Sequence, residues 1–198
     1  RDVAPSRGLG DVYKRQLFSC EKEKVETCGF DTIRLTESFL TEYAKGDGVD
    51  NYMIALASGS TVFDPTNQQW HTENDGWVML ISLFAEPVAN LGAPEIPEGK
   101  YTLGSAPGAG VWSSEEDVNQ LYYTGKDGVS TLVPVSGELT FAKTADGYIM
   151  TGKFLAADQK EYCVTYTGTL KFQPQGETSV IDQPVNCLLY TSPSPRDG

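Results

Sequence analysis

The sequence predicts an all-β fold, an antiparallel β-sandwich of the jelly-roll type with about eight or nine strands. Short runs of apolar residues recur along the chain, and turns rich in Gly, Asp and Asn separate them. No segment shows a sustained 3.6-residue repeat, which excludes a long helix. A calycin-like up-and-down barrel is the alternative, because a closed sheet gives the same succession of strands and turns.

The expected strands can be justified in order along the chain. The strand expected at 51–57 alternates large and small residues. The strand expected at 77–85 is almost continuously apolar, as in a central strand covered on both faces. The next three are short or irregular, and in the last three one residue parity is apolar, which indicates a meander with one buried face. The predicted strands are 39–44, 51–57, 77–85, 99–103, 121–123, 129–135, 138–142, 148–155 and 161–172.

Length and charge limit the possible functions. The chain has 198 residues, of which 39% are hydrophobic, and this suits one domain with a real core. The formal net charge of −12 argues against nucleic acid or an anionic membrane surface as a partner, because both would repel the chain. No run of about 18 apolar residues is present, so no transmembrane helix is expected.

Both ends of the chain resemble the translation of a sequencing-library adaptor. Residues 6–16 read SRGLGDVYKRQ and residues 187–197 read CLLYTSPSPRD. Codons exist for the first string whose reverse complement, read in a shifted frame, encodes the second. We therefore expect residues 1–16 and 187–198 to be non-biological. The remaining segments are a signal-peptide stub with a tether at 17–29, an all-β domain at 30–172 and a linker at 173–186.

Residues 17–20 read LFSC, with an apolar residue three positions before the cysteine and a small residue directly before it. They resemble a bacterial lipobox, in which the cysteine carries diacylglycerol. The charged residues that follow, EKEKVET, are typical of a solvated tether and resemble a surface-export signal. The resemblance implies a lipoprotein held by outer-membrane lipid through Cys20, on the cell surface or on the periplasmic face.

Two further cysteines, Cys28 and Cys163, lie in the natural segment. In an oxidising compartment we expect them to form a disulfide, and two isolated thiols are the alternative. No Cys-x-x-Cys spacing occurs, so a zinc site is not supported.

Six motifs describe the turns and core positions of the domain. They read NYMIALASG, DGWVMLISLF, IPEGKYTLG, GELTFAK, DGYIMTGKFL and YCVTYTGTL. The layout is similar to an all-β domain of Bacteroidetes outer-membrane lipoproteins and covers most of residues 49–172. The resemblance implies a fold and a location, and it assigns no catalytic residue.

Residues suited to catalysis are sparse. His71 is the only histidine, and no nucleophile-elbow sequence accompanies it. The acids at 115–117 are typical of a solvated loop, and the acidic segment 47–51 lacks the spacing of a calcium-binding hand. We therefore predict no enzyme, no catalytic residue, no metal site and no cofactor.

Aromatic residues give the strongest indication of binding. Trp70 and Trp112 lie in the two long predicted loops, and the adjacent Tyr122 and Tyr123 must place one ring on each face of a strand. Exposed flat rings stack on sugar faces or on apolar groups of a partner. The sequence therefore favours a glycan or small-ligand binding module, with these four residues as its candidate contacts.

Three alternatives stay open at this point. The two tryptophans could cap the ends of the core. The protein could instead be a structural or assembly component that contacts another surface protein and binds no small molecule. A barrel could also hold an apolar ligand in a cavity lined by Met53, Met79 and Met150.

Overall fold

The structure is a computed structural model, and it describes residues 32–88, 94–115 and 117–174. Within these residues the chain forms fourteen strands and no helix, so the predicted all-β class is confirmed. This part of the chain accordingly contains no helix of the length and apolarity needed to cross a membrane. The strands are β1 (Thr32–Leu35), β2 (Glu37–Ala44), β3 (Asp50–Ala57), β4 (Thr61–Asp64), β5 (Gln69–Thr72), β6 (Gly76–Ala85), β7 (Gly99–Gly104), β8 (Val111–Ser113), β9 (Gln120–Gly125), β10 (Gly128–Leu132), β11 (Pro134–Thr144), β12 (Gly147–Ala156), β13 (Glu161–Gly168) and β14 (Gln173–Pro174).

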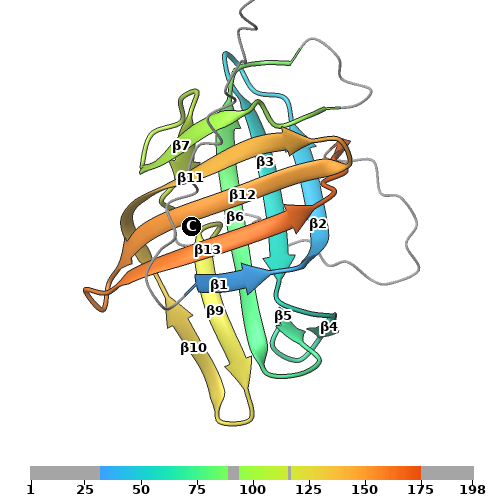
Figure 1. Cartoon of the computed structure of the whole chain (residues 1–198), viewed down its shortest axis with the longest axis vertical. Coiled ribbons are helices and arrows are strands. Elements are labelled where there is room, and N and C mark those ends of the chain that lie inside the picture. Colours follow the sequence, from blue (N-terminus) through green and yellow to red (C-terminus); the bar gives the residue numbers. More distant parts are fainter. Residues whose placement is uncertain (1–31, 89–93, 116, 175–198) are drawn as a thin grey trace, which may run out of the picture.

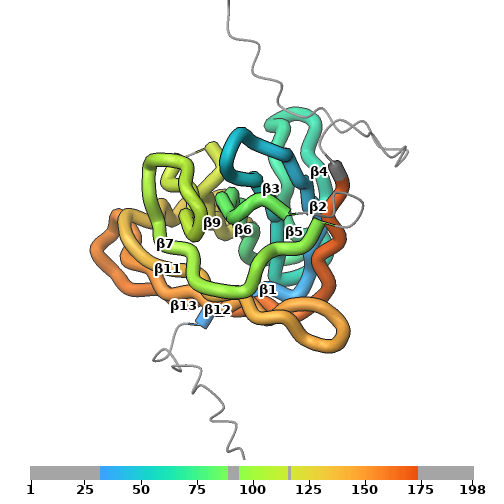
Figure 2. Tube along the Cα trace, turned by 90° about the horizontal axis from the view of Figure 1, so that it is seen from above, coloured from blue at the N-terminus to red at the C-terminus, as the bar shows by residue number. Residues whose placement is uncertain are grey.

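Twelve strands belong to one mixed sheet, and β4 and β5 form a separate hairpin. The large sheet curls into two layers whose strands cross, with β7, β11, β12, β13 and β1 in front of β2, β3, β6 and β9 (Figure 1). Figure 2 shows the same arrangement from above, with the two layers facing each other. Since both layers are parts of one sheet, the fold has features of a sandwich and of a barrel.

The first two strands close the sheet. β1 pairs with β13, and after the single residue Thr36 the chain continues as β2, which pairs with β3. β14 pairs with the far end of β2. Between these ladders the hydroxyl of Ser38 donates to the carbonyl oxygen of Thr169 at 3.2 Å, and the hydroxyl of Thr41 donates to that of Lys171. The two ends of the strand order are therefore joined along one seam.

The mixed sheet corrects the purely antiparallel sandwich predicted above. The pairs β1–β13, β7–β8 and β14–β2 are parallel, and each involves only two to four residues in register. Strands this short carry too few residues for an alternation pattern to indicate a partner or a direction. For the same reason β4, β5 and β8 fall in segments that the sequence predicted to be loops.

The core lies between the two layers. Its largest fully buried side chains come from both of them. They belong to Trp112, Tyr52, Phe141, Phe154, Ile54, Leu56, Met79, Ile81, Leu83, Ile96, Leu121 and Leu139.

The three methionines do not line a common cavity. Met79 and Met150 are fully buried in the packed core. Met53 is half-buried, and its neighbours Tyr52 and Ile54 point into the core, so alternation places Met53 on the opposite face of β3. The idea of an apolar ligand held among these three side chains is therefore wrong.

Cys163 is disulfide-bonded. It is the only cysteine among the described residues, so its partner lies outside them, as do Cys20, Cys28 and Cys187. In the β1–β13 ladder Cys163 is opposite Thr32, the first residue of β1. Cys28 precedes Thr32 by four residues, which an extended chain spans in about 14 Å. Cys28 is thus within reach of Cys163, and their pairing stays a prediction.

Candidate functional site

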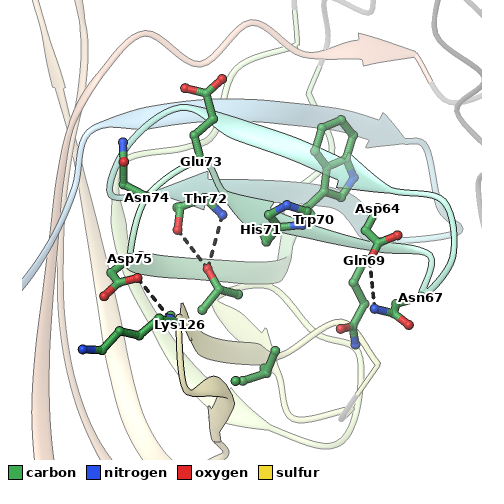
Figure 3. Close-up of a pocket in the computed structure, with 14 residues that line it drawn as sticks. Asp64, Asn67, Gln69, Trp70, His71, Thr72, Glu73, Asn74, Asp75 and Lys126 are labelled. Carbon is green, nitrogen blue, oxygen red and sulfur yellow. Dashed lines mark hydrogen bonds between the residues drawn. The ribbon is translucent and has the colours of Figure 1, made fainter.

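A surface pocket of about 410 Å³ lies between β5, the turn that follows it and the β9–β10 hairpin (Figure 3). Ten of its fourteen lining residues have polar or charged side chains. The lining consists of Asp64, Asn67, Gln69, Trp70, His71, Thr72, Glu73, Asn74, Asp75, Thr124, Gly125, Lys126, Gly128 and Val129. The pocket therefore offers many hydrogen-bonding groups.

Two buried threonines link β5 to β9 at the centre of the pocket. The hydroxyl groups of Thr72 on β5 and Thr124 on β9 are 2.9 Å apart, and the backbone N–H of Thr72 donates to the Thr124 hydroxyl at 3.3 Å. Gly76 lies beside them, because a Cβ atom there would come within 2.6 Å of the Ser58 hydroxyl and 2.9 Å of the Thr72 hydroxyl. The close approach of β5 to the start of β6 thus requires a glycine at this position.

A side-chain carboxylate lies at each end of the pocket. At one end Asp64 accepts hydrogen bonds from the backbone N–H of Thr66 and from the amide of Asn67, both at 2.8 Å. These bonds, above all the one from Thr66, hold the pKa of Asp64 below its usual value. At the other end Asp75 accepts a hydrogen bond from the backbone N–H of Lys126 at 3.2 Å, which joins the turn after β5 to the β9–β10 turn.

Trp70 lies on β5 rather than in a loop and anchors the β4–β5 hairpin. Its half-buried ring packs against Phe39 and Phe63, with ring centroids 5.0 and 5.3 Å apart. Its carbonyl oxygen accepts a hydrogen bond from the hydroxyl of Tyr122 at 2.8 Å. In Figure 3 its indole and the side chain of Gln69 point to opposite sides of the strand. Trp70 therefore contributes to the pocket wall while its ring fixes the hairpin to the sheet.

The expectation that Trp112 offers an exposed ring is wrong. Trp112 is 0% exposed and packs edge-on against Phe154 in the core. β8 pairs with both β6 and β7, and in that position strand alternation turns the indole inward. Trp70 and Trp112 therefore do not share a surface, and the Trp112 ring is part of the core.

Tyr122 and Tyr123 lie on opposite faces of β9, as the sequence requires. Tyr122 is buried in a small cluster on the outer face with Ala57 and Val78. Tyr123 is half-buried and packs against Trp77, with ring centroids 5.2 Å apart. Neither tyrosine lines the pocket, so both differ from the ligand contacts that the sequence suggested.

Burial raises the pKa of Tyr122 to about 12, and burial together with a hydrogen bond to Asp50 raises that of Tyr43 to about 12. An unfolded tyrosine ionises near pH 10, so the unfolded state loses these protons first. We therefore expect the contribution of these two tyrosines to the free energy of unfolding to be constant below about pH 10 and to fall as the pH rises toward 12.

Denaturant titrations at pH 8 to 11 test this alkaline dependence. Tyr122→Phe should lower stability at pH 8 by about 1 kcal/mol through the lost hydrogen bond, and it should flatten the alkaline decline. An unchanged slope in the variant would show that Tyr122 ionises equally easily in both states.

The sequence singled out His71 and the acidic loop at 47–51, and the structure gives them different places. His71 lines the pocket with Glu73 and Asp75. Asp50 is buried, and its carboxylate accepts hydrogen bonds from the hydroxyl of Tyr43 and the backbone N–H of Val88, both at 2.8 Å. No group of three or more His, Cys, Asp or Glu in the described part of the chain could hold a metal ion.

Sequence reasoning missed Asp64, Asn67, Gln69 and Lys126 as members of one site. The segment 58–75 is typical of a long polar loop and 126–128 of a turn, which indicates exposure without a partner. The register of β6 with β9, in which Gly76 is opposite Thr124, brings the two turns together. Comparisons of the chain with protein-family models, with curated proteins and with solved structures find no match.

Proposed function

We propose that the chain is a binding module of the cell envelope whose pocket between β5 and the β9–β10 hairpin binds a glycan. The observation that carries the proposal is the polar lining of this pocket around the Thr72–Thr124 pair. Amide, hydroxyl, imidazole and carboxylate groups together donate and accept hydrogen bonds. A ligand with many hydroxyl groups uses both kinds of group, and a sugar is such a ligand.

An apolar ligand fits the same pocket poorly. Pockets for such ligands are lined mainly by hydrophobic and aromatic side chains. Here the apolar side chains are those of Trp70 and Val129, and the Trp70 ring is engaged with two phenylalanines. An apolar ligand would strip water from the polar walls without replacing its hydrogen bonds, which costs about 1–3 kcal/mol for each group left unpaired.

A glycan array with the full chain tests the proposal, followed by titration calorimetry on each sugar that binds. Gln69→Ala and His71→Ala remove exposed or half-buried hydrogen-bonding groups of the pocket, and each should weaken binding at least tenfold. Thr167→Ala, on the exposed outer side of β13, is the matched control and should leave the affinity unchanged. Absence of binding across the array, or equal losses in all three variants, would contradict the proposal.

The proposal places the module outside the cytoplasm, held by outer-membrane lipid through Cys20, in the manner of the Bacteroidetes lipoproteins that its motifs resemble. The disulfide at Cys163 supports an oxidising compartment, because such bonds form and persist there. Expressed behind a complete signal peptide, the protein should sediment with membranes, and Cys20→Ala should move it to the soluble fraction. Unchanged fractionation of the variant would contradict the lipid anchor.

The free edge of β10 favours a second candidate, a structural or assembly component of the cell surface. Among the described strands β10 pairs only with β9, and its residues from Gly128 to Thr131 are exposed. An uncharged open edge can accept a strand from another chain. Under this candidate Thr131→Lys should abolish an association seen by analytical ultracentrifugation and leave any glycan binding intact.

A further inference from the structure

We infer that the pocket takes the terminal sugar of a glycan chain and leaves the internal sugars outside. The inference rests on the proposed function and adds which part of the glycan is recognised. It depends on the residues that line the two ends of the pocket and on the hydrogen bonds between them.

Both ends of the pocket carry hydrogen-bonded structure. In Figure 3 the bond between Asn67 and Asp64 lies on one side and the bond between Asp75 and Lys126 lies on the other. The hydrogen bonds drawn at Thr72 lie between them. The first bond orders the β4–β5 turn, and the second joins two turns across the pocket.

A polysaccharide bound along its length needs a groove that the chain can enter and leave at opposite ends. Here hydrogen-bonded turns line both ends, so a chain that ran along the pocket would have to pass over Asp64 and Asn67 at one end and over Asp75 and Lys126 at the other. The volume of about 410 Å³ is also near the lower limit of small-ligand pockets, which span about 300–1,000 Å³. A chain therefore enters from the open side, with its last sugar foremost.

The charges of the walls further select an uncharged terminal sugar. The carboxyl groups of Asp64, Glu73 and Asp75 line the pocket, against the single ammonium group of Lys126. The ion pairs of the described residues involve Lys100, Lys143 and Lys153, so neither Glu73 nor Lys126 is neutralised by a described partner. A uronic acid would be repelled by this excess of negative charge.

Chain-length dependence of binding tests the inference on the full chain. The probes are the methyl β-glycosides of glucose and of N-acetylglucosamine, the β-1,4-linked trimer and hexamer of each, and methyl glucuronide. For the sugar that binds, the Kd of the hexamer should be within threefold of that of the methyl glycoside, and the glucuronide should bind at least tenfold more weakly. An affinity that rises tenfold or more with chain length would overturn the inference and leave the proposed function standing. Binding of no probe, together with an array without a positive sugar, would overturn both.

Opening one end of the pocket provides a second test. Asp75→Ala removes the acceptor of the Lys126 backbone N–H, so the two turns are no longer joined there. The variant should bind the hexamer more tightly than the methyl glycoside, by threefold or more. Asp127→Ala, which removes the neighbouring carboxylate of the β9–β10 turn, should keep the equal affinities of the unmodified protein. Equal affinities for both sugars in Asp75→Ala would show that the hydrogen bond between Lys126 and Asp75 does not limit the length of the bound glycan chain.

Discussion

Trp112→Ala is expected to lower the free energy of unfolding by about 3–5 kcal/mol, the usual cost of removing a large aromatic side chain from a core. The indole is 0% exposed and packs against Phe154, whose ring centroid is 6.2 Å away. Because β8 is held between β6 and β7, the surrounding strands have little freedom to collapse into the space left behind. Equilibrium denaturation at pH 7 measures the effect.

A comparison with Trp70 provides the control. Trp70→Ala removes a half-buried ring, so its cost in stability should be clearly smaller, and it should also weaken glycan binding because Trp70 lines the pocket. Trp112→Phe preserves much of the buried volume and should leave glycan binding unchanged. If Trp112→Phe kept its stability and lost binding, the indole would belong to a ligand site and its assignment to the core would be wrong.

Cys163→Ser is expected to lower the free energy of unfolding by about 4–5 kcal/mol if Cys28 is the partner. Cys163 is disulfide-bonded, and a bond to Cys28 would close a loop of about 135 residues. In the chain-entropy model a loop of that length gives the quoted stabilisation, because the crosslink restricts the unfolded chain. The measurement is equilibrium denaturation with and without reductant.

The partner is identified by matched variants. Cys28→Ser should cost as much as Cys163→Ser, and the double variant should cost no more than either, since all three lack the same bond. Cys20→Ser is the control and should leave stability unchanged. A loss in Cys20→Ser with none in Cys28→Ser would assign the bond to Cys20, and a loss in neither would assign it to Cys187, the remaining cysteine.

The sequence predicted those strands whose residues carry a long pattern. The run expected at 77–85 is β6, Gly76–Ala85, and the meander expected at 138–172 is β11, β12 and β13. β6 is a ten-residue apolar run, and in β11, β12 and β13 the side chains of one parity enter the core along eight or more residues, so these patterns can be recognised locally. β8 has three residues and β4 has four, and their pairing depends on segments far away in the chain.

In the candidate site, too, the residues that are close together in the sequence could be predicted, and a residue from a distant segment could not. His71, Glu73 and Asp75 stand out in the sequence because they are close together in one polar segment, and all three line the pocket. Lys126 is about 50 residues further along, and only the pairing of β6 with β9 brings it there. The prediction that Trp112 lies in an exposed loop was wrong for a related reason. A glycine-rich segment gives no local sign that three of its residues form a strand between two other strands.

The seam between β1–β2 and β13–β14 has a consequence for how the chain reaches its native state. Ser38 and its partner Thr169 are 131 positions apart, so β1 and the second side of β2 find their neighbours only after nearly the whole domain has left the ribosome. Contacts at such separation require loop closure before they stabilise anything, and folding slows accordingly. During that interval one side of β1 and β2 is an unpaired strand edge, open to pairing with other chains. Nascent copies should therefore depend on chaperones until β13 arrives, and slow synthesis of the last third should favour aggregation over folding.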